Sequence, residues 1–316
     1  MEQDRLGIID SLSAGLNLVA QRLWVIAIPV LLDLWYWRGP QLSIAPLLRQ
    51  IEQALARSAP AAMPDAPVNI NAVNELLDAL GQHFNLYSLL SASLPSLLGV
   101  PSLMANASSD NASITEVHSW LAMIGLAAVL VLAGLAIGCL YLTLIAQGLS
   151  QQSVEPRALL RQASAMWLRV VALVLLVLFF AISLAVPFSF LISLLTFVSR
   201  GAASFLMGIF YMSIVWLGLY LYFVVYAIIT DRVGPLRAIW NSANVVARNF
   251  WSALGLVLLV VVLSRGLSLV WHRLGEVHPI GTIIGIAGHA FIGSGLVAAS
   301  LLFYRDRYQG WQQQMA

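Results

Sequence analysis

The stretch from Gly234 to Trp251 decides the fold, and it reads GPLRAIWNSANVVARNFW. Pro235 stands one residue into the segment, where a helix tolerates proline because its first N–H groups have no helical partner. Apolar residues then recur at the three-four spacing of an amphipathic helix, with Arg237 and Arg248 on other faces. An aromatic pair leads into about twenty apolar residues, enough to cross a bilayer. The stretch therefore predicts a helix on the membrane surface that turns into a span.

The composition of the whole chain agrees with a membrane protein. Hydrophobic residues make up 60% of the 316 positions and charged residues 9%, whereas soluble domains are about 45–50% apolar and about 25% charged. All 16 basic residues are arginine, and a net charge of +2 gives no reason to expect nucleic acid as a partner. The single cysteine, Cys139, excludes an intramolecular disulfide and a cysteine metal cluster. We therefore expect an all-α, polytopic membrane protein.

Apolar runs divide the chain into three regions. Residues 1–40 hold a surface helix and the first span, 41–119 form a helical module outside the cytoplasm, and 120–316 form a bundle of five further spans. The first residues lack the basic start of a cleavable signal, so the first span is expected to remain as an anchor. The six predicted spans are 23–37, 120–145, 166–198, 205–229, 251–270 and 280–304, and further interfacial helices are predicted near 156–167 and 235–249. Pro187 predicts a kink or an early end in the third span.

The segment 84–105 inside the module carries no charge and could be taken for a seventh span. Pro95, Pro101 and several serines argue against a regular transmembrane helix there. If it spanned, the following residues would be cytoplasmic, although they include Asp110 and Glu116 and no arginine. A surface-bound or re-entrant segment is therefore preferred, and a span remains the alternative.

The distribution of arginine predicts the orientation. With both termini in the cytoplasm, ten of the 16 arginines lie on the inner side, and three of the other six fall in or beside the long 41–119 module, where the positive-inside rule counts less. We therefore expect a multi-pass protein of the cytoplasmic membrane with both ends inside the cell.

The N-terminal region is similar to the stretch that opened this section. A shift of 227 residues aligns Asn17 with Asn244, Val19 with Val246, and Trp24 with Trp251. A looser match begins near Pro156. Internal repeats are common in membrane folds, so one interpretation is a threefold unit of surface helix and span. Chance similarity between apolar segments is the other.

Three segments resemble those of a known group. The stretch 238–251, the first-span ending 29–40 (PVLLDLWYWRGP) and the tail 304–310 (YRDRYQG) look like an uncharacterised family of bacterial six-span membrane proteins. That family is similar to the membrane domain fused to some glycerophosphodiester phosphodiesterases. The tail departs from the family pattern at Gln309, where an acid is usual, and the chain has no counterpart of the catalytic domain. The resemblance therefore implies six spans with interfacial helices and carries over no activity.

Three ionisable residues lie at or near the predicted membrane depth: Asp33, Arg265 and His289. Such residues are costly in lipid and often line pathways or pair with one another. Asp33 and Arg265 both fall in the outer half, so they either form an ion pair between the first and fifth spans or reach the outer interface separately. His289 is expected to hydrogen-bond between helices, with a proton relay as the alternative.

Other candidate features concern metal binding and packing. His272, Glu276 and His278 come nearest to a metal set, but Gly275 and Pro279 argue against a regular helix there, so a solvated loop is preferred. Glycines at helical spacing predict close helix packing. These are Gly134, Gly138, Gly281, Gly285 and Gly293. The sequence contains no P-loop, metalloprotease, nucleophile-elbow or dinucleotide motif, and we expect no cofactor.

The sequence leaves two functions of different classes. The first is a non-enzymatic scaffold or accessory component of the cytoplasmic membrane, with the bilayer, other membrane proteins or a second copy of the chain as partners. The second is a transporter of a small molecule or lipid, with Asp33, Arg265 and His289 along its path. An intramembrane enzyme has no motif support. A polar cavity at membrane depth between these three residues would favour transport, and a closed, dry bundle would count against it.

Overall fold

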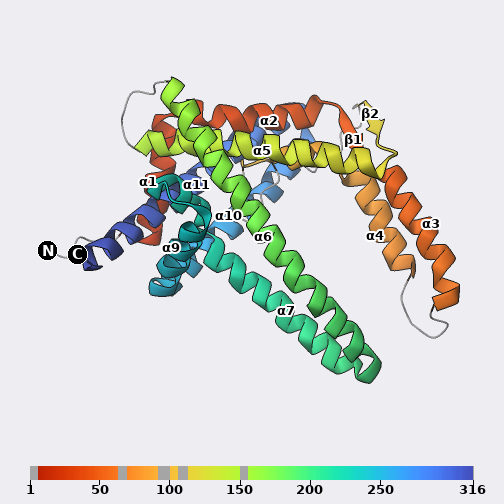
Figure 1. Cartoon of the computed structure of the whole chain (residues 1–316). Coiled ribbons are helices and arrows are strands. Elements are labelled where there is room, and N and C mark those ends of the chain that lie inside the picture. The colour runs from red at the N-terminus through yellow and green to blue at the C-terminus, as the bar shows by residue number, and fades with distance from the viewer. Residues whose placement is uncertain (1–5, 63–69, 92–99, 106–112, 150–155, 316) are drawn as a thin grey trace.

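The computed structural model describes residues 6–62, 70–91, 100–105, 113–149 and 156–315 (Figure 1). Helices make up most of the described chain. Five helices are long and apolar enough to cross a membrane, and a sixth crossing results if the bent pair Ile8–Gln21 and Leu23–Arg38 counts as one. The chain is thus all-α in class, with the long apolar helices of a membrane-embedded protein.

The elements follow in this order. The first region contains α1 (Ile8–Gln21), the 3-10 helix η1 (Leu23–Ile26) and α2 (Ala27–Arg38). The inserted module contains β1 (Gln41–Ser43), α3 (Ala45–Ala62), α4 (Ile70–His83), the 3-10 helix η2 (Leu86–Leu90) and β2 (Ile114–Glu116). The remainder contains α5 (Trp120–Leu149), α6 (Pro156–Val198), α7 (Arg200–Leu221), α8 (Val224–Asp231), α9 (Pro235–Arg248), α10 (Phe250–Val277) and α11 (Pro279–Met315).

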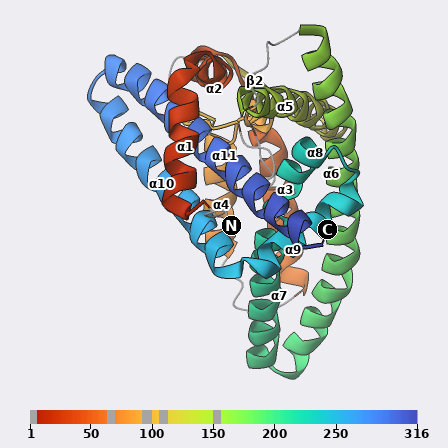
Figure 2. The same cartoon turned by 90° about the vertical axis from the view of Figure 1, so that its left-hand side faces the viewer.

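The two ends of the described chain lie together, away from the α3–α4 hairpin (Figure 1). A guanidinium nitrogen of Arg307, on α11, donates to the carbonyl oxygen of Leu6 at 3.1 Å. α1 lies across α11, with α10 alongside (Figure 2). The crossing is close because a Cβ on Gly15 would lie only 2.5 Å from the backbone nitrogen of Ala299. α1 and α11 are therefore joined through small residues, as helix packing in membranes favours.

α1 and α9 are equivalent elements. A shift of 227 residues maps both ends of α1 onto both ends of α9. The preceding residues, Gly7 and Gly234, are both extended, with φ −64°, ψ 168° and φ −73°, ψ 167°. The following residues, Arg22 and Asn249, leave the helix with φ −138°, ψ 60° and φ −128°, ψ 40°. Matching ends and matching breaks favour a true repeat for these two units over chance similarity.

The unit that begins at Pro156 lacks that break. α6 runs without interruption from Pro156 to Val198, so the 156–167 segment continues directly into the span. The expected early end at Pro187 is wrong, because the helix includes that proline. Phe188, beside it, packs on Phe210 of α7 with ring centroids 4.9 Å apart. A neighbouring helix of this kind supports a helix through an internal proline.

The region after Trp271 also differs from the prediction. The expected solvated loop at 272–279 is wrong for most of its length, because α10 continues to Val277 before α11 begins at Pro279. Gly275 does not break the helix, since it packs close to Thr282 of α11. Pro279 occupies the first position of the next helix, where proline is tolerated.

The inserted module returns to its starting point. β1 and β2 pair in parallel, with Gln41 opposite Ile114, and so bring the two ends of the insertion together. The buried side chain of Asn85 supports this junction by accepting hydrogen bonds from the backbone N–H groups of Leu42 and Tyr87, both at 3.1 Å. The strands are the departure from a purely helical prediction, and each is three residues long.

The described parts of 84–105 pack halfway along two candidate spans. A Cβ on Gly134 of α5 would lie 2.6 Å from the carbonyl oxygen of Leu90, in η2. Gly293 of α11 lies against the ring of Pro101 in the same way. Each glycine is about 21 Å from the start of its helix at 1.5 Å per residue. Short, irregular backbone held inside a bundle at this position is typical of a re-entrant segment.

Candidate functional site

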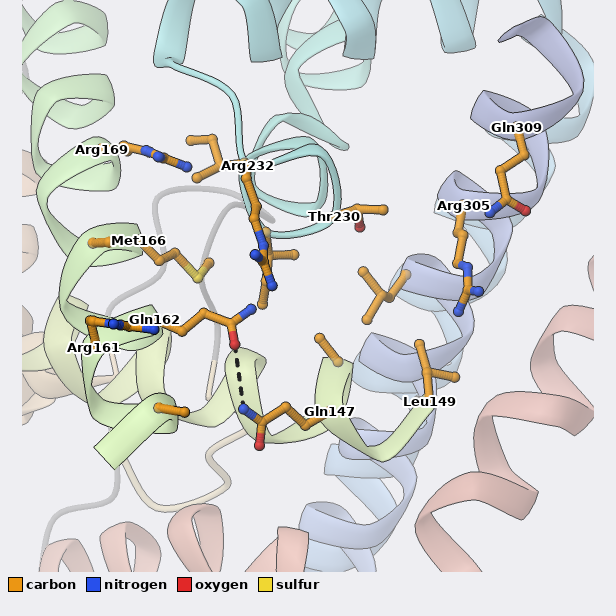
Figure 3. Close-up of a pocket in the computed structure, with 16 residues that line it drawn as sticks. Gln147, Leu149, Arg161, Gln162, Met166, Arg169, Thr230, Arg232, Arg305 and Gln309 are labelled. Carbon is orange, nitrogen blue, oxygen red and sulfur yellow. Dashed lines mark hydrogen bonds between the residues drawn. The ribbon is translucent and has the colours of Figure 1, made fainter. Parts of the chain in front are cut away.

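A cavity of about 900 Å³ lies between the ends of α5, α6, α8 and α11 (Figure 3). Its apolar walls include Met166, Ile228 and Leu301. The polar lining includes Gln147 and Gln162, whose side chains are joined by a hydrogen bond of 3.4 Å. Both polar and apolar groups thus face one space, which is the usual character of a small-molecule site.

Four arginines line this cavity from three parts of the chain: Arg161, Arg169, Arg232 and Arg305. Arg161 and Arg169 lie on one face of α6, about two turns apart. Arg232 projects from the segment after α8 into the space between α6 and α11 (Figure 3). Arg305 lies on the opposite wall of the cavity. It belongs to α11, which continues as a helix to Met315.

The backbone at Arg232 has an unusual conformation. Its φ of 54° and ψ of 32° are left-handed, and no other non-glycine residue in the described ranges has a positive φ. This conformation costs an L-residue about 1–2 kcal/mol. Such outliers collect at functional sites, where surrounding structure holds them in place. Here the left-handed turn ends α8 and directs the arginine side chain into the cavity.

The charge of the cavity is one-sided. Among the residues that the structure describes, its lining includes four arginines and no aspartate or glutamate. Within the described ranges, none of the four arginines makes an ion pair within 4.0 Å. Guanidinium groups stay protonated and present planar donor forks that match carboxylate and phosphate oxygens. The arrangement is therefore suited to an anion.

A second pocket of about 420 Å³ adjoins the cavity, and Thr230 and Gln309 line both. Asp231 and Arg237 line only the smaller pocket. Oδ2 of Asp231 accepts a hydrogen bond from the hydroxyl of Tyr304 at 2.7 Å and one from the amide of Asn241 at 3.0 Å. The carboxylate of the smaller pocket is thus held in one orientation by neighbouring helices.

Asp33 is fully buried, and its carboxylate is engaged by the 84–105 segment. It accepts hydrogen bonds from the backbone N–H groups of Leu103, at 2.9 and 3.0 Å, and Met104, at 3.0 Å. The hydroxyl of Ser102 also donates to it. The structure places no ion pair between Asp33 and Arg265, whose side chain is exposed on α10.

His289 is buried on α11, with 7% of its surface exposed. None of Asp33, Arg265 and His289 lines the arginine cavity, and the structure does not bring the three together around it. Of the packing glycines, Gly281 and Gly285 lie against Leu274 and Trp271 of α10, Gly134 and Gly293 lie against the 84–105 segment, and Gly138 is buried in α5.

The weak metal candidates are engaged separately. Glu276 accepts a hydrogen bond from Arg273 at 3.0 Å. Nδ1 of His278 accepts one from the backbone N–H of Ile280 at 3.1 Å, at the start of α11. His272 lies exposed on α10. Among the residues that the structure describes, no group of three or more His, Cys, Asp or Glu side chains could hold a metal ion.

The sequence did not single out the arginine cavity. All four of its arginines are among the ten that the sequence predicts on the inner side of the membrane, where the positive-inside rule accounts for them without a binding role. Only the packing of α6, α8 and α11 brings them to one space.

The chain matches no family model, no curated protein and no solved structure. The resemblance to the membrane domain fused to glycerophosphodiester phosphodiesterases therefore stays a prediction.

Proposed function

We propose that this chain is an accessory protein of the cytoplasmic membrane that binds a phosphate-bearing anion in the arginine-lined cavity. The observation that carries the proposal is the convergence of Arg161, Arg169, Arg232 and Arg305 on one space whose described lining residues include no carboxylate. A phosphate group supplies several acceptor oxygens, and charge-assisted hydrogen bonds to arginine are about twice as strong as neutral ones.

The lining favours binding over catalysis. Arginine cannot serve as a general base because it stays protonated. The described residues that line the cavity include no histidine, cysteine, aspartate or glutamate, and the hydroxyl of Thr230 has no neighbouring base among them. These features support a non-enzymatic role, in line with the first of the two functions expected from the sequence.

Six crossings with both ends in the cytoplasm fit this proposal best. The contact between Arg307 and Leu6 supports an arrangement in which both ends of the described chain lie on one side. Five crossings would separate them, so the bent pair of α1 and α2 is best counted as the sixth. The positive-inside rule then places the arginine cavity at the cytoplasmic face, where soluble phosphate esters and anionic lipid headgroups are both accessible.

Transport that uses Asp33, Arg265 and His289 has less support. The Asp33 carboxylate is already occupied by the Ser102–Met104 backbone and hydroxyl. Neither Arg265 nor His289 lines the large cavity. These contacts favour a structural role for Asp33 over a place on a solute path.

The test is binding of two phosphate probes to the purified full chain. Ethyl phosphate is titrated calorimetrically in uncharged detergent, and phosphatidic acid is offered in phosphatidylcholine nanodiscs. Arg232→Gln and Arg305→Gln should each weaken binding of the favoured probe about tenfold, because each removes charge-assisted hydrogen bonds. Arg273→Gln is the matched control, since that exposed arginine pairs with Glu276 outside the cavity. Unchanged affinity of both cavity variants for both probes would overturn the proposal.

A further inference from the structure

The two neighbouring pockets differ in their charged lining: four arginines line the larger, whereas Asp231 and Arg237 line the smaller. Asp231 and Arg232 are consecutive, with Cα atoms about 3.8 Å apart, yet Asp231 lines the smaller pocket and Arg232 the larger. Their side chains diverge at the point where Arg232 adopts the left-handed conformation. Thr230 and Gln309 border both spaces, so the two pockets adjoin.

Asp231 is fixed as a hydrogen-bond acceptor. Tyr304 and Asn241 both donate to its Oδ2, and Asn241 also donates to the hydroxyl of Tyr308 at 3.2 Å. In the part of the chain that the structure describes, no arginine lies within 4.0 Å of this carboxylate, although Arg237 lines the same pocket. A carboxylate presented in this way favours a ligand group that donates hydrogen bonds.

We infer that the ligand is a phosphate ester whose alcohol part carries an amino or hydroxyl group. Its phosphate lies among the arginines of the large cavity, and its donor group reaches across Thr230 and Gln309 to Asp231. This inference rests on the proposed function, because it assigns the phosphate to the same four arginines. A soluble aminoalkyl phosphate and a phospholipid headgroup share this chemistry.

Three matched probes test the inference without any change to the protein. Phosphoethanolamine carries an ammonium group with three N–H donors, phosphocholine keeps the positive charge but has no such donor, and ethyl phosphate has neither. Wild-type protein should bind phosphoethanolamine about tenfold more tightly than either other probe, the size expected for one hydrogen bond to a charged group. Equal affinities for all three probes would overturn the inference.

Variants locate the effect. In Asp231→Asn, the amide oxygen still accepts from Tyr304 while the charge is lost, so the preference for phosphoethanolamine should fall about tenfold. Asp78→Asn, on exposed α4, is the control and should keep the preference. A preference that survives in Asp231→Asn would place the donor elsewhere and overturn the inference.

The remaining measurements distinguish failure of the proposed function from failure of this inference, and a lipid ligand from a soluble one. If Arg232→Gln weakens ethyl phosphate binding but Asp231→Asn leaves the probe preference intact, the phosphate site stands and the donor site fails. If Arg232→Gln leaves all binding unchanged, the proposed function itself fails. Nanodiscs that contain phosphatidylethanolamine or phosphatidylcholine, compared by native mass spectrometry of the bound lipid, identify a lipid source. Selective retention of phosphatidylethanolamine would support the inference in its lipid form, and equal retention with tight phosphoethanolamine binding would support it in its soluble form.

Discussion

Asp33 shows how this fold accommodates a carboxylate among apolar helices. A buried carboxylate without partners costs several kcal/mol, and irregular backbone at the same depth carries N–H groups that lipid cannot satisfy. The Ser102–Met104 turn donates hydrogen bonds to both oxygens of Asp33. The carboxylate thereby gains donors, and the backbone N–H groups of the turn gain an acceptor. The carboxylate therefore joins α2 to the 84–105 segment.

Replacement of Asp33 should accordingly lower stability. Asp33→Asn keeps one oxygen acceptor but loses the charge and turns an N–H₂ group toward the Leu103 N–H, at a cost of about 1–3 kcal/mol. Asp33→Ala removes every acceptor and should cost more. The measurement is the midpoint of thermal unfolding of the purified protein, with Asp78→Asn as the exposed control. A wild-type midpoint for Asp33→Ala would show that this carboxylate does not hold the segment.

Elements depend on both local signals and packing, and only the local signals are visible in the sequence. Pro235, the glycine before it and the three-four apolar spacing predicted α9, and the similarity of the N-terminal region to this stretch predicted α1. The break between α7 and α8 contains no proline or glycine from which it could be predicted. It is supported instead by Ser242 of α9, whose hydroxyl donates to the Tyr220 carbonyl at 2.6 Å and accepts from the Phe223 N–H at 3.2 Å.

At Pro187 and Gly275 the opposite occurs: each of these residues usually ends a helix, but here the helix continues through it. Phe188, next to Pro187, packs on Phe210 of α7, and Gly275 lies close to Thr282 of α11, so tertiary contacts accompany the continuous helix at both sites. Sequence periodicity could therefore predict the all-α class and the approximate positions of the long apolar helices, while their continuity required the packed structure.

α5 offers a matched pair of glycines that tests the docking of 84–105. Gly134→Ala would place a methyl group 2.6 Å from the Leu90 carbonyl oxygen and should displace η2, lowering stability by about 1–3 kcal/mol. Gly125→Ala, in the same helix, meets nothing within 4 Å and should be neutral or stabilising by up to about 1 kcal/mol. Thermal unfolding of the two variants checks the prediction. Equal midpoints would mean that the segment does not pack on α5.

At the scale of the whole molecule, the candidate site arises from the meeting of elements that are distant in sequence. Arg161 and Arg305 belong to helices on opposite walls of the cavity, and no spacing rule connects them. The positive-inside rule also explains the position of each arginine separately, so the sequence gives no reason to predict a binding site from them. The left-handed backbone of Arg232 is likewise invisible in the sequence, because arginine is not a residue that favours it.

The same whole-molecule arrangement predicts the sidedness of the protein. With either five or six crossings, α3–α4 and the C-terminal end of α11 lie on opposite faces of the membrane. Only six crossings, with the α1–α2 pair included, also keep the contacting residues Leu6 and Arg307 on the same face. Single cysteines at Arg5 and at the exposed Asp78 and Gln313, introduced into a Cys139→Ser background, distinguish the cases. An impermeant maleimide should label Asp78→Cys on intact cells, and should label Arg5→Cys and Gln313→Cys only after permeabilisation, because the arginine-rich ends stay in the cytoplasm. Labelling of Asp78→Cys and Arg5→Cys from the same side would mean that the bent pair does not cross the membrane. The prediction that the arginine cavity lies at the cytoplasmic face would then be wrong.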